Sequence, residues 1–93
     1  MRFNLETPEI VKRFATDCQI ALHDPARAPH VADISNILGL RNVQILNYHV
    51  VTGSTERTEK RMGLTPRSAK EVILALTPVL EALYDLHDPH PSF

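Results

Sequence analysis

The sequence is poor in cysteine, glycine and aromatic residues. Its 93 residues include one cysteine, three glycines, no tryptophan, two tyrosines and three phenylalanines. A single cysteine, Cys18, cannot form an internal disulfide, which fits a reducing compartment and excludes a disulfide-stabilised secreted scaffold. So few glycines, without any polar tract, also exclude the composition of a disordered segment over most of the length.

Long apolar runs are missing as well. No stretch approaches the ~18 consecutive apolar residues of a membrane span. The first residues, "MRFNLETPE", lack the apolar core of a signal peptide, so we expect a cytoplasmic protein. A chain of this length makes one small domain, which buries only about two-thirds of its unfolded surface and gains from self-association.

Threonine–proline pairs mark candidate helix beginnings at Thr7-Pro8, Thr65-Pro66 and Thr77-Pro78. A threonine side chain accepts hydrogen bonds from the first amides of a helix, and proline at the first helical position loses none. Proline inside a helix costs ~3 kcal/mol, so the third pair predicts a break or a sharp kink.

Glycines separate the remaining apolar-periodic runs. The spacing predicts helices over about 30–38, 41–51 and 55–62, which end near Gly39, Gly53 and Gly63. The β-branched run "VQILNYHVV" also allows a strand, but it has no hairpin partner. We therefore predict one all-α domain, a compact bundle of five or six short helices over residues 1–93. It comprises a helix-turn-helix at about 31–51, a basic helix pair at about 54–76, a C-terminal helix at about 77–87 and a tail at 88–93.

The first helix–glycine–helix pattern has Ile34 and the small Ser35 ahead of Gly39, with Leu38 and Leu40 on either side of the glycine. This pattern resembles the helix-turn-helix of bacterial and phage repressors of the Cro and CI kind. The resemblance implies that the second helix enters the major groove, where arginine reads guanine and asparagine or glutamine reads adenine. The outward residues that would contact bases or phosphates are Arg41, Asn42, Gln44 and Asn47. The alternative is a solvated face on a core helix.

A second turn has the sequence "GLTPRS", residues 63–68, followed by Lys70. It resembles the turn of regulators of the quorum-sensing type. Glu59 departs from that pattern, because it stands where a small buried residue belongs and a buried unpaired carboxylate is costly. We expect the basic residues around this turn to contact phosphates, unless they form only a charged exposed face; they are Lys60, Arg61, Arg67 and Lys70, with Arg57 beside them.

The charge is unevenly distributed. The formal net charge is −1, although DNA affinity comes largely from lysine and arginine. Residues 54–76 nevertheless hold five basic and three acidic residues, whereas residues 77–93 hold three acidic residues and no lysine or arginine. This asymmetry fits one face toward DNA and another toward solvent or protein.

No signature of catalysis or cofactor binding is present. The sequence has no phosphate-binding glycine loop and no nucleophile–base arrangement, so we predict a non-enzyme without a cofactor. His87 and His90, with Asp88 between them, fall short of the four ligands of structural zinc.

The apolar stripe from Val72 to Leu86 is longer than one core needs, which predicts a homodimer through the C-terminal helices. Together these features predict a small sequence-specific DNA-binding transcriptional regulator, repressor-like, of a bacterium, phage or mobile element. Its partner would be a double-stranded DNA operator. The alternative is a protein-interaction module, such as an antiactivator or an antitoxin-like inhibitor, that has this fold without binding DNA.

Overall fold

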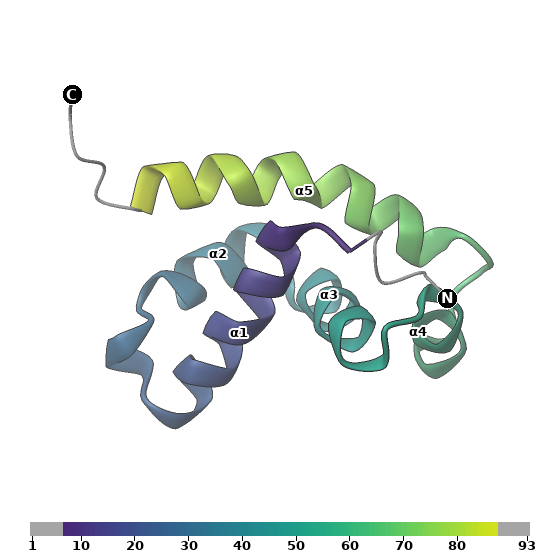
Figure 1. The fold of residues 1–93 in the computed structure, drawn as a ribbon, viewed down its shortest axis with the longest axis horizontal. Helices are drawn as coiled ribbons and strands as arrows, with labels where there is room; N and C mark the ends of the chain where they lie inside the picture. The colour runs from purple at the N-terminus through teal and green to yellow at the C-terminus, as the bar shows by residue number, and fades with distance from the viewer. Residues whose placement is uncertain (1–6, 88–93) are drawn as a thin grey trace.

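The computed structural model describes residues 7–87, which form an all-α fold without strands in that range. This architecture confirms the predicted fold class, and the "VQILNYHVV" segment is helical. The elements are α1 (Glu9–His23), the short 3-10 helix η2 (Pro25–Arg27), α2 (His30–Leu38), α3 (Leu40–Thr52), α4 (Thr55–Met62) and α5 (Ser68–His87) (Figure 1).

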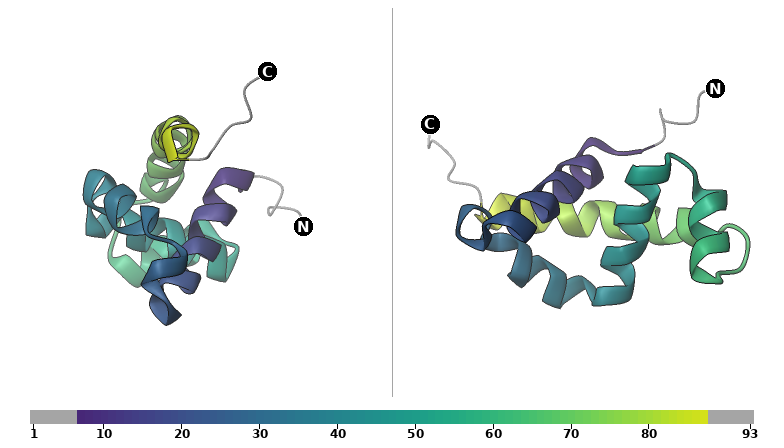
Figure 2. Two further views of the ribbon diagram at one scale, coloured as in Figure 1. Left: turned by 90° about the vertical axis from the view of Figure 1, so that its left-hand side faces the viewer. Right: turned by 90° about the horizontal axis from the view of Figure 1, so that it is seen from below.

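The long helix α5 packs against all four other α-helices. Its C-terminal half lies over α1 and α2, and its N-terminal end lies over α4, as the views in Figures 1 and 2 show. The centre of the core consists of side chains with no measurable solvent exposure, contributed by α1, α2, α3 and α5. They are Val11, Phe14, Ile34, Leu46 and Leu80.

Proline does not interrupt the last helix. Pro78 lies inside α5, which runs without a break through the position where the sequence predicted a break or a sharp kink. The Thr77 hydroxyl donates to the Ile73 carbonyl at 2.7 Å, within the turn that precedes the proline. Residues 68–87 are therefore one helix, and the separate last helix predicted at 77–87 is part of it.

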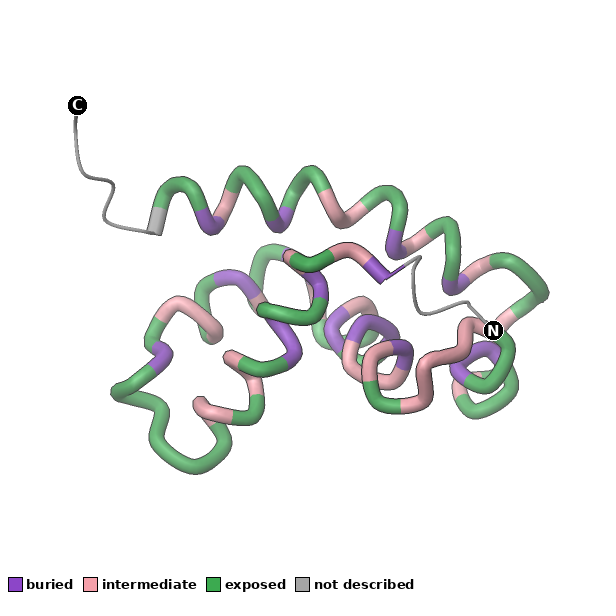
Figure 3. The backbone as a smooth tube through the Cα atoms, in the orientation of Figure 1, coloured by how far each residue is buried: buried purple, intermediate pink, exposed green. Residues whose placement is uncertain are grey.

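The apolar side chains of the helices are buried only in part. Ile34 and Leu38 of α2 are buried, but Ile37 is 60% exposed. Leu22 and Val51, near the ends of α1 and α3, are exposed as well. Figure 3 shows exposed positions along the whole outer side of α5. The predicted tail at 88–93 lies outside the described residues.

None of the helices within residues 7–87 has the length and apolar character that crossing a membrane requires.

Gly39 is the only residue between α2 and α3, and its backbone has φ 94° and ψ 142°. This conformation lies outside the left-handed helical region, in a region used almost only by glycine. Gly63 has φ 67° and ψ 37°, an ordinary left-handed cap. A Cβ atom at Gly39 or Gly63 would meet nothing within 4 Å, so substitution costs come from the backbone alone.

We predict that Gly39→Ala and Gly63→Ala each lower the free energy of unfolding by about 1–2 kcal/mol. Asparagine tolerates the left-handed helical region, so Gly63→Asn should recover part of the loss, whereas Gly39→Asn should recover none. Urea unfolding followed by circular dichroism measures all four variants. Equal recovery at the two positions would contradict the assigned Gly39 backbone.

Candidate nucleic-acid interface

The α2–α3 corner forms the first predicted helix pair, but with a shorter connection than a helix-turn-helix uses. Gly39 alone joins the two helices, whereas the motif in DNA-binding proteins has a turn of about three or four residues. The recognition helix of such a motif would be α3.

The four predicted base-reading residues of α3 fall into two groups. Arg41 and Gln44 are exposed. The Asn42 amide donates to the Leu38 carbonyl at 2.8 Å and is half-buried. The Asn47 amide donates to the Val43 carbonyl at 3.0 Å and lies 3.7 Å from the Cys18 sulfur on α1. The structure therefore presents Arg41 and Gln44 to solvent, whereas both asparagine amides bond within the protein.

The α4–α5 corner is built from strong local capping interactions. The Ser54 hydroxyl accepts from the Arg57 amide at 3.2 Å and caps the start of α4. At the other end, the Leu64 amide donates to the Glu59 carbonyl at 2.8 Å and the Gly63 amide donates to the Lys60 carbonyl at 3.4 Å. These two bonds around a left-handed Gly63 form a Schellman motif, which ends the helix and turns the chain.

Glu59 fixes the second half of this corner. Its carboxylate is buried and accepts from the Ala69 amide at 3.0 Å, in the first turn of α5. Ala69 itself has no measurable exposure. An unpaired buried carboxylate at this position would be costly, as the sequence analysis noted. The structure offsets that cost by placing the Glu59 carboxylate at the N-terminus of α5, which favours an anion and whose first amides lack helical acceptors.

The entry into α5 differs from the predicted Thr65-Pro66 start. The helix begins at Ser68, and Arg67 has φ 74°, a left-handed conformation that is uncommon outside glycine. The hydroxyls of Thr65 and Ser68 are hydrogen-bonded to each other, and the Ser68 amide donates to the Thr65 carbonyl at 3.2 Å. The turn therefore runs from Gly63 to Arg67 and leaves Arg67 exposed at the corner.

Exposed basic side chains gather at this corner, which we call the basic corner and define as residues 54–70. Its cations are Arg57, Lys60, Arg61, Arg67 and Lys70, all exposed. The first three are spaced as i, i+3 and i+4, so they share one face of α4. Arg61 also lies over the Tyr48 ring, with its guanidinium carbon 5.7 Å from the ring centre. This contact joins Arg61 of α4 to Tyr48 of α3.

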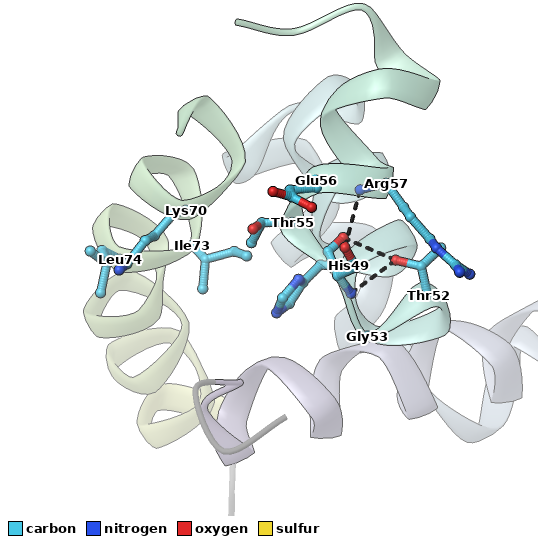
Figure 4. A pocket seen from close by; sticks show the side chains of 10 residues that line it. His49, Thr52, Gly53, Thr55, Glu56, Arg57, Lys70, Ile73 and Leu74 are labelled. Carbon is cyan, nitrogen blue, oxygen red and sulfur yellow. Dashed lines mark hydrogen bonds between the residues drawn. The ribbon is translucent and has the colours of Figure 1, made fainter. Parts of the chain in front are cut away.

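A hollow of about 810 Å³ adjoins the basic corner, between the α3–α4 junction and α5. Figure 4 shows Thr55, Glu56 and Arg57 on one side of it, and Lys70, Ile73 and Leu74 of α5 on the other. Its floor includes the buried His49, whose Nε2 lies 2.8 Å from the Thr7 hydroxyl. The His49 side chain is only 5% exposed.

A second polar cluster joins α1, α2 and α5, and the sequence reading missed it. Asp17 Oδ2 lies 2.8 Å from His30 Nε2 and accepts from the Tyr84 hydroxyl at 2.6 Å. The Arg13 guanidinium carbon lies 4.2 Å from the centre of the Tyr84 ring. Asp17 and Tyr84 are 67 residues apart, so no local spacing could have signalled the pair.

This cluster has a structural character. Burial raises the pKa of Tyr84, and its hydrogen bond to Asp17 raises it further, so the phenol stays protonated. Burial also raises the pKa of Cys18, which opposes formation of a reactive thiolate. Among residues 7–87, no group of three or more histidine, cysteine or acidic residues is placed to hold a metal ion.

Comparisons of the chain with protein-family models, with curated proteins and with solved structures gave no match.

Glu59→Ala should lower the free energy of unfolding by about 1–3 kcal/mol, because it leaves a buried amide of α5 without its acceptor. Glu59→Gln should cost less, since its amide oxygen can still accept from Ala69. Glu56→Ala, at an exposed acid on the same helix, is the control and should change stability by less than ~0.5 kcal/mol. Chemical denaturation compares the three, and the capping role is refuted by an alanine effect no larger than that of the control.

Tyr84 should resist ionisation well above pH ~10, the ordinary pKa of tyrosine. Tyr48→Phe leaves Tyr84 as the only tyrosine, so absorbance at 295 nm reports its titration alone. Because the pKa of Tyr84 is raised in the folded state, its stabilising contribution is complete below pH ~10 and is lost as the pH rises further.

Adding Asp17→Ala to that variant should lower the pKa of Tyr84 toward its ordinary value, whereas Asp33→Ala, at an exposed acid, should not move it. Ionisation of Tyr84 near pH ~10 in the folded Tyr48→Phe protein would refute the assigned Asp17–Tyr84 hydrogen bond.

Proposed function

We propose that this protein is a repressor-like regulator that binds double-stranded DNA through the basic corner. The observation that carries the proposal is the combination of a rigidly capped helix–turn–helix geometry with five exposed cations on it. The α2–α3 corner, from which the sequence reading had expected base contacts, has a one-residue connection and two asparagines bonded inside the protein.

The geometry supports this assignment because the five-residue turn from Gly63 to Arg67 is closer to the three or four residues of a helix-turn-helix than the single Gly39 is. The eight-residue α4 ends in a left-handed glycine, and the chain then turns into a long second helix. A small residue, Ala69, is buried where the two helices approach, and Glu59 fixes their relative position with a hydrogen bond. A rigid pair of this kind can present the start of α5 to the major groove.

The distribution of exposed charged residues supports the DNA-binding proposal more strongly than the net charge of −1 does. Glu59 is buried and capped, so the exposed acids of the basic corner reduce to Glu56. Five exposed cations then face one exposed anion within residues 54–70, and the exposed Glu71 follows directly after Lys70. Contacts between such cations and phosphates release condensed counterions and dominate non-specific affinity.

The residues available for reading bases lie at the start of α5. Arg67 and Lys70 are exposed there, and both side chains can donate to guanine in the major groove. The Glu81 and Asp85 carboxylates lie on the C-terminal half of the same helix. Only the N-terminal end of α5 is therefore suited to approach the phosphate backbone.

The double variant Arg57→Gln/Lys60→Gln tests the proposal, because neither side chain has a packing role comparable to that of Arg61. Binding to a fluorescent random-sequence duplex should weaken roughly 10- to 100-fold at low salt. The slope of log K against log[salt] should become shallower by about 2, since each phosphate contact contributes about 0.9.

The matched control is Lys12→Gln/Arg27→Gln, which removes two exposed cations that lie on α1 and η2, outside the basic corner. A second arm, Arg41→Ala/Gln44→Ala, asks whether the α2–α3 corner contacts DNA instead. Unchanged binding by the first variant and loss by the second would move the interface to α3. No salt-dependent binding of any duplex, and no sequence enriched from a random pool, would refute DNA binding.

A protein-interaction module is the second candidate, because large apolar side chains are exposed on α5. Leu74 is 62% exposed, Val79 38% and Leu86 80%. An antiactivator or antitoxin-like inhibitor would use such a surface to hold a different protein. Co-purification with a protein partner, together with no salt-dependent binding to any nucleic acid, distinguishes this function.

A further inference from the structure

Arg67 has a backbone conformation that glycine normally provides. Its φ of 74° lies in the left-handed region. Among residues 7–87, the other positions with positive φ are all the glycines of the chain, Gly39, Gly53 and Gly63. A residue with a Cβ atom is less stable in this region than glycine, because the Cβ atom lies too close to the following carbonyl oxygen. The chain therefore has an arginine at a position where glycine would be more stable.

The turn before α5 fixes this conformation of Arg67. The Ser68 amide donates to the Thr65 carbonyl at 3.2 Å, which closes a four-residue turn. Pro66, at its second position, has a φ held near −65° by the ring, so only the type II turn also accounts for a positive φ at the third position. Type II turns favour glycine or asparagine at that third position. The strain at Arg67 is therefore part of the turn itself.

No contact within the described part of the chain compensates for this strain. Arg67 is exposed, and its guanidinium has no hydrogen bond, ion pair or ring contact with any of residues 7–87. Arg61, by comparison, lies over the Tyr48 ring. A strained backbone position at an exposed site is typical of functional residues, where the side chain acts on something outside the fold.

The side chains next to Arg67 favour contact with base edges over contact with the phosphate backbone alone. Lys70 and Glu71, in the first turn of α5, are both exposed. The Glu71 carboxylate would repel a phosphate, but it can accept a hydrogen bond from the amino group of cytosine. An arginine donates two parallel hydrogen bonds to O6 and N7 of guanine. The mixed charge at this point therefore matches the edge of a base pair in the major groove.

We infer that Arg67 determines sequence specificity, by donating to O6 and N7 of a guanine in the duplex that the basic corner binds. This inference rests on the proposed function and makes it more specific. The type II turn presents the guanidinium at the start of the second helix, where helix-turn-helix proteins contact bases. Lys70 contacts a phosphate instead. A lysine at position 67 would keep the charge but lose the planar pair of donors.

Urea unfolding tests the strained turn without DNA. Arg67→Gly should raise the midpoint of unfolding, because glycine adopts the left-handed region without a steric penalty. Arg67→Ala keeps the Cβ atom and should leave the midpoint unchanged, since the guanidinium has no contact to lose. Lys60→Gly, within α4, is the matched control and should lower the midpoint. A midpoint for Arg67→Gly no higher than that for Arg67→Ala would overturn the strained turn. A large decrease for Arg67→Ala would overturn the inference, because the side chain would then stabilise the fold.

A duplex that the full chain enriches from a random pool tests the base contact. Arg67→Lys should lower the affinity for this duplex roughly 5- to 100-fold, because the paired hydrogen bonds to guanine are lost. Its affinity for a random-sequence duplex should stay within about twofold, since the charge is kept. Lys70→Gln is the matched control and should weaken binding to both duplexes by a similar factor.

Replacing each guanine of the enriched duplex in turn by 7-deazaguanine removes the N7 acceptor and identifies the contacted base. One replacement should weaken binding by the unsubstituted chain severalfold and have no further effect on Arg67→Lys. An equal effect on both proteins would overturn the role of Arg67 and leave the proposed function in place. A chain that enriches no duplex and shows no salt-dependent binding would refute the proposed function, and this inference with it.

Discussion

The rest of this structure depends on one face of α5. Ala69, Ile73, Leu80 and Tyr84 are buried along that helix, which contacts all four other α-helices. A chain this short has little apolar surface to bury, so the loss of any large part of this face would leave too small a core. The helix also continues through Pro78 rather than ending there, which keeps both halves of the face on one rigid element.

Two polar contacts fix the ends of α5 against the shorter helices. Near its beginning, the Glu59 carboxylate accepts from the Ala69 amide, which joins α4 to α5. Near its end, the Tyr84 hydroxyl donates to Asp17, which in turn contacts His30, and this joins α1 and α2 to α5. Buried polar groups are costly unless they are paired. Paired as they are, these groups favour one arrangement of the helices over other packings of the same apolar stripes.

This arrangement separates the two ends of the molecule electrostatically. Burial of Glu59 removes a negative charge from the surface at the beginning of α5 and leaves the cations of the basic corner in excess, whereas Glu81 and Asp85 remain exposed on the other half of the helix. A net charge of −1 therefore describes neither end. The DNA-binding proposal depends on this polarity.

The sequence by itself determined the helical class and most of the helix ends. The bounds of α2 and α4, including the glycine that ends α4, depend on hydrogen bonds between residues at most five positions apart, so the local pattern contains the information. Only the tertiary structure determined which polar side chains between those ends have a hydrogen-bond partner within the protein and which face solvent. The Ala69 amide lies ten positions from Glu59, the Cys18 sulfur lies 29 positions from Asn47, and Tyr84 lies 67 positions from Asp17. A side chain with a partner at such a distance looks the same in the sequence as one that faces solvent, because its hydrogen bond exists only after the helices have packed.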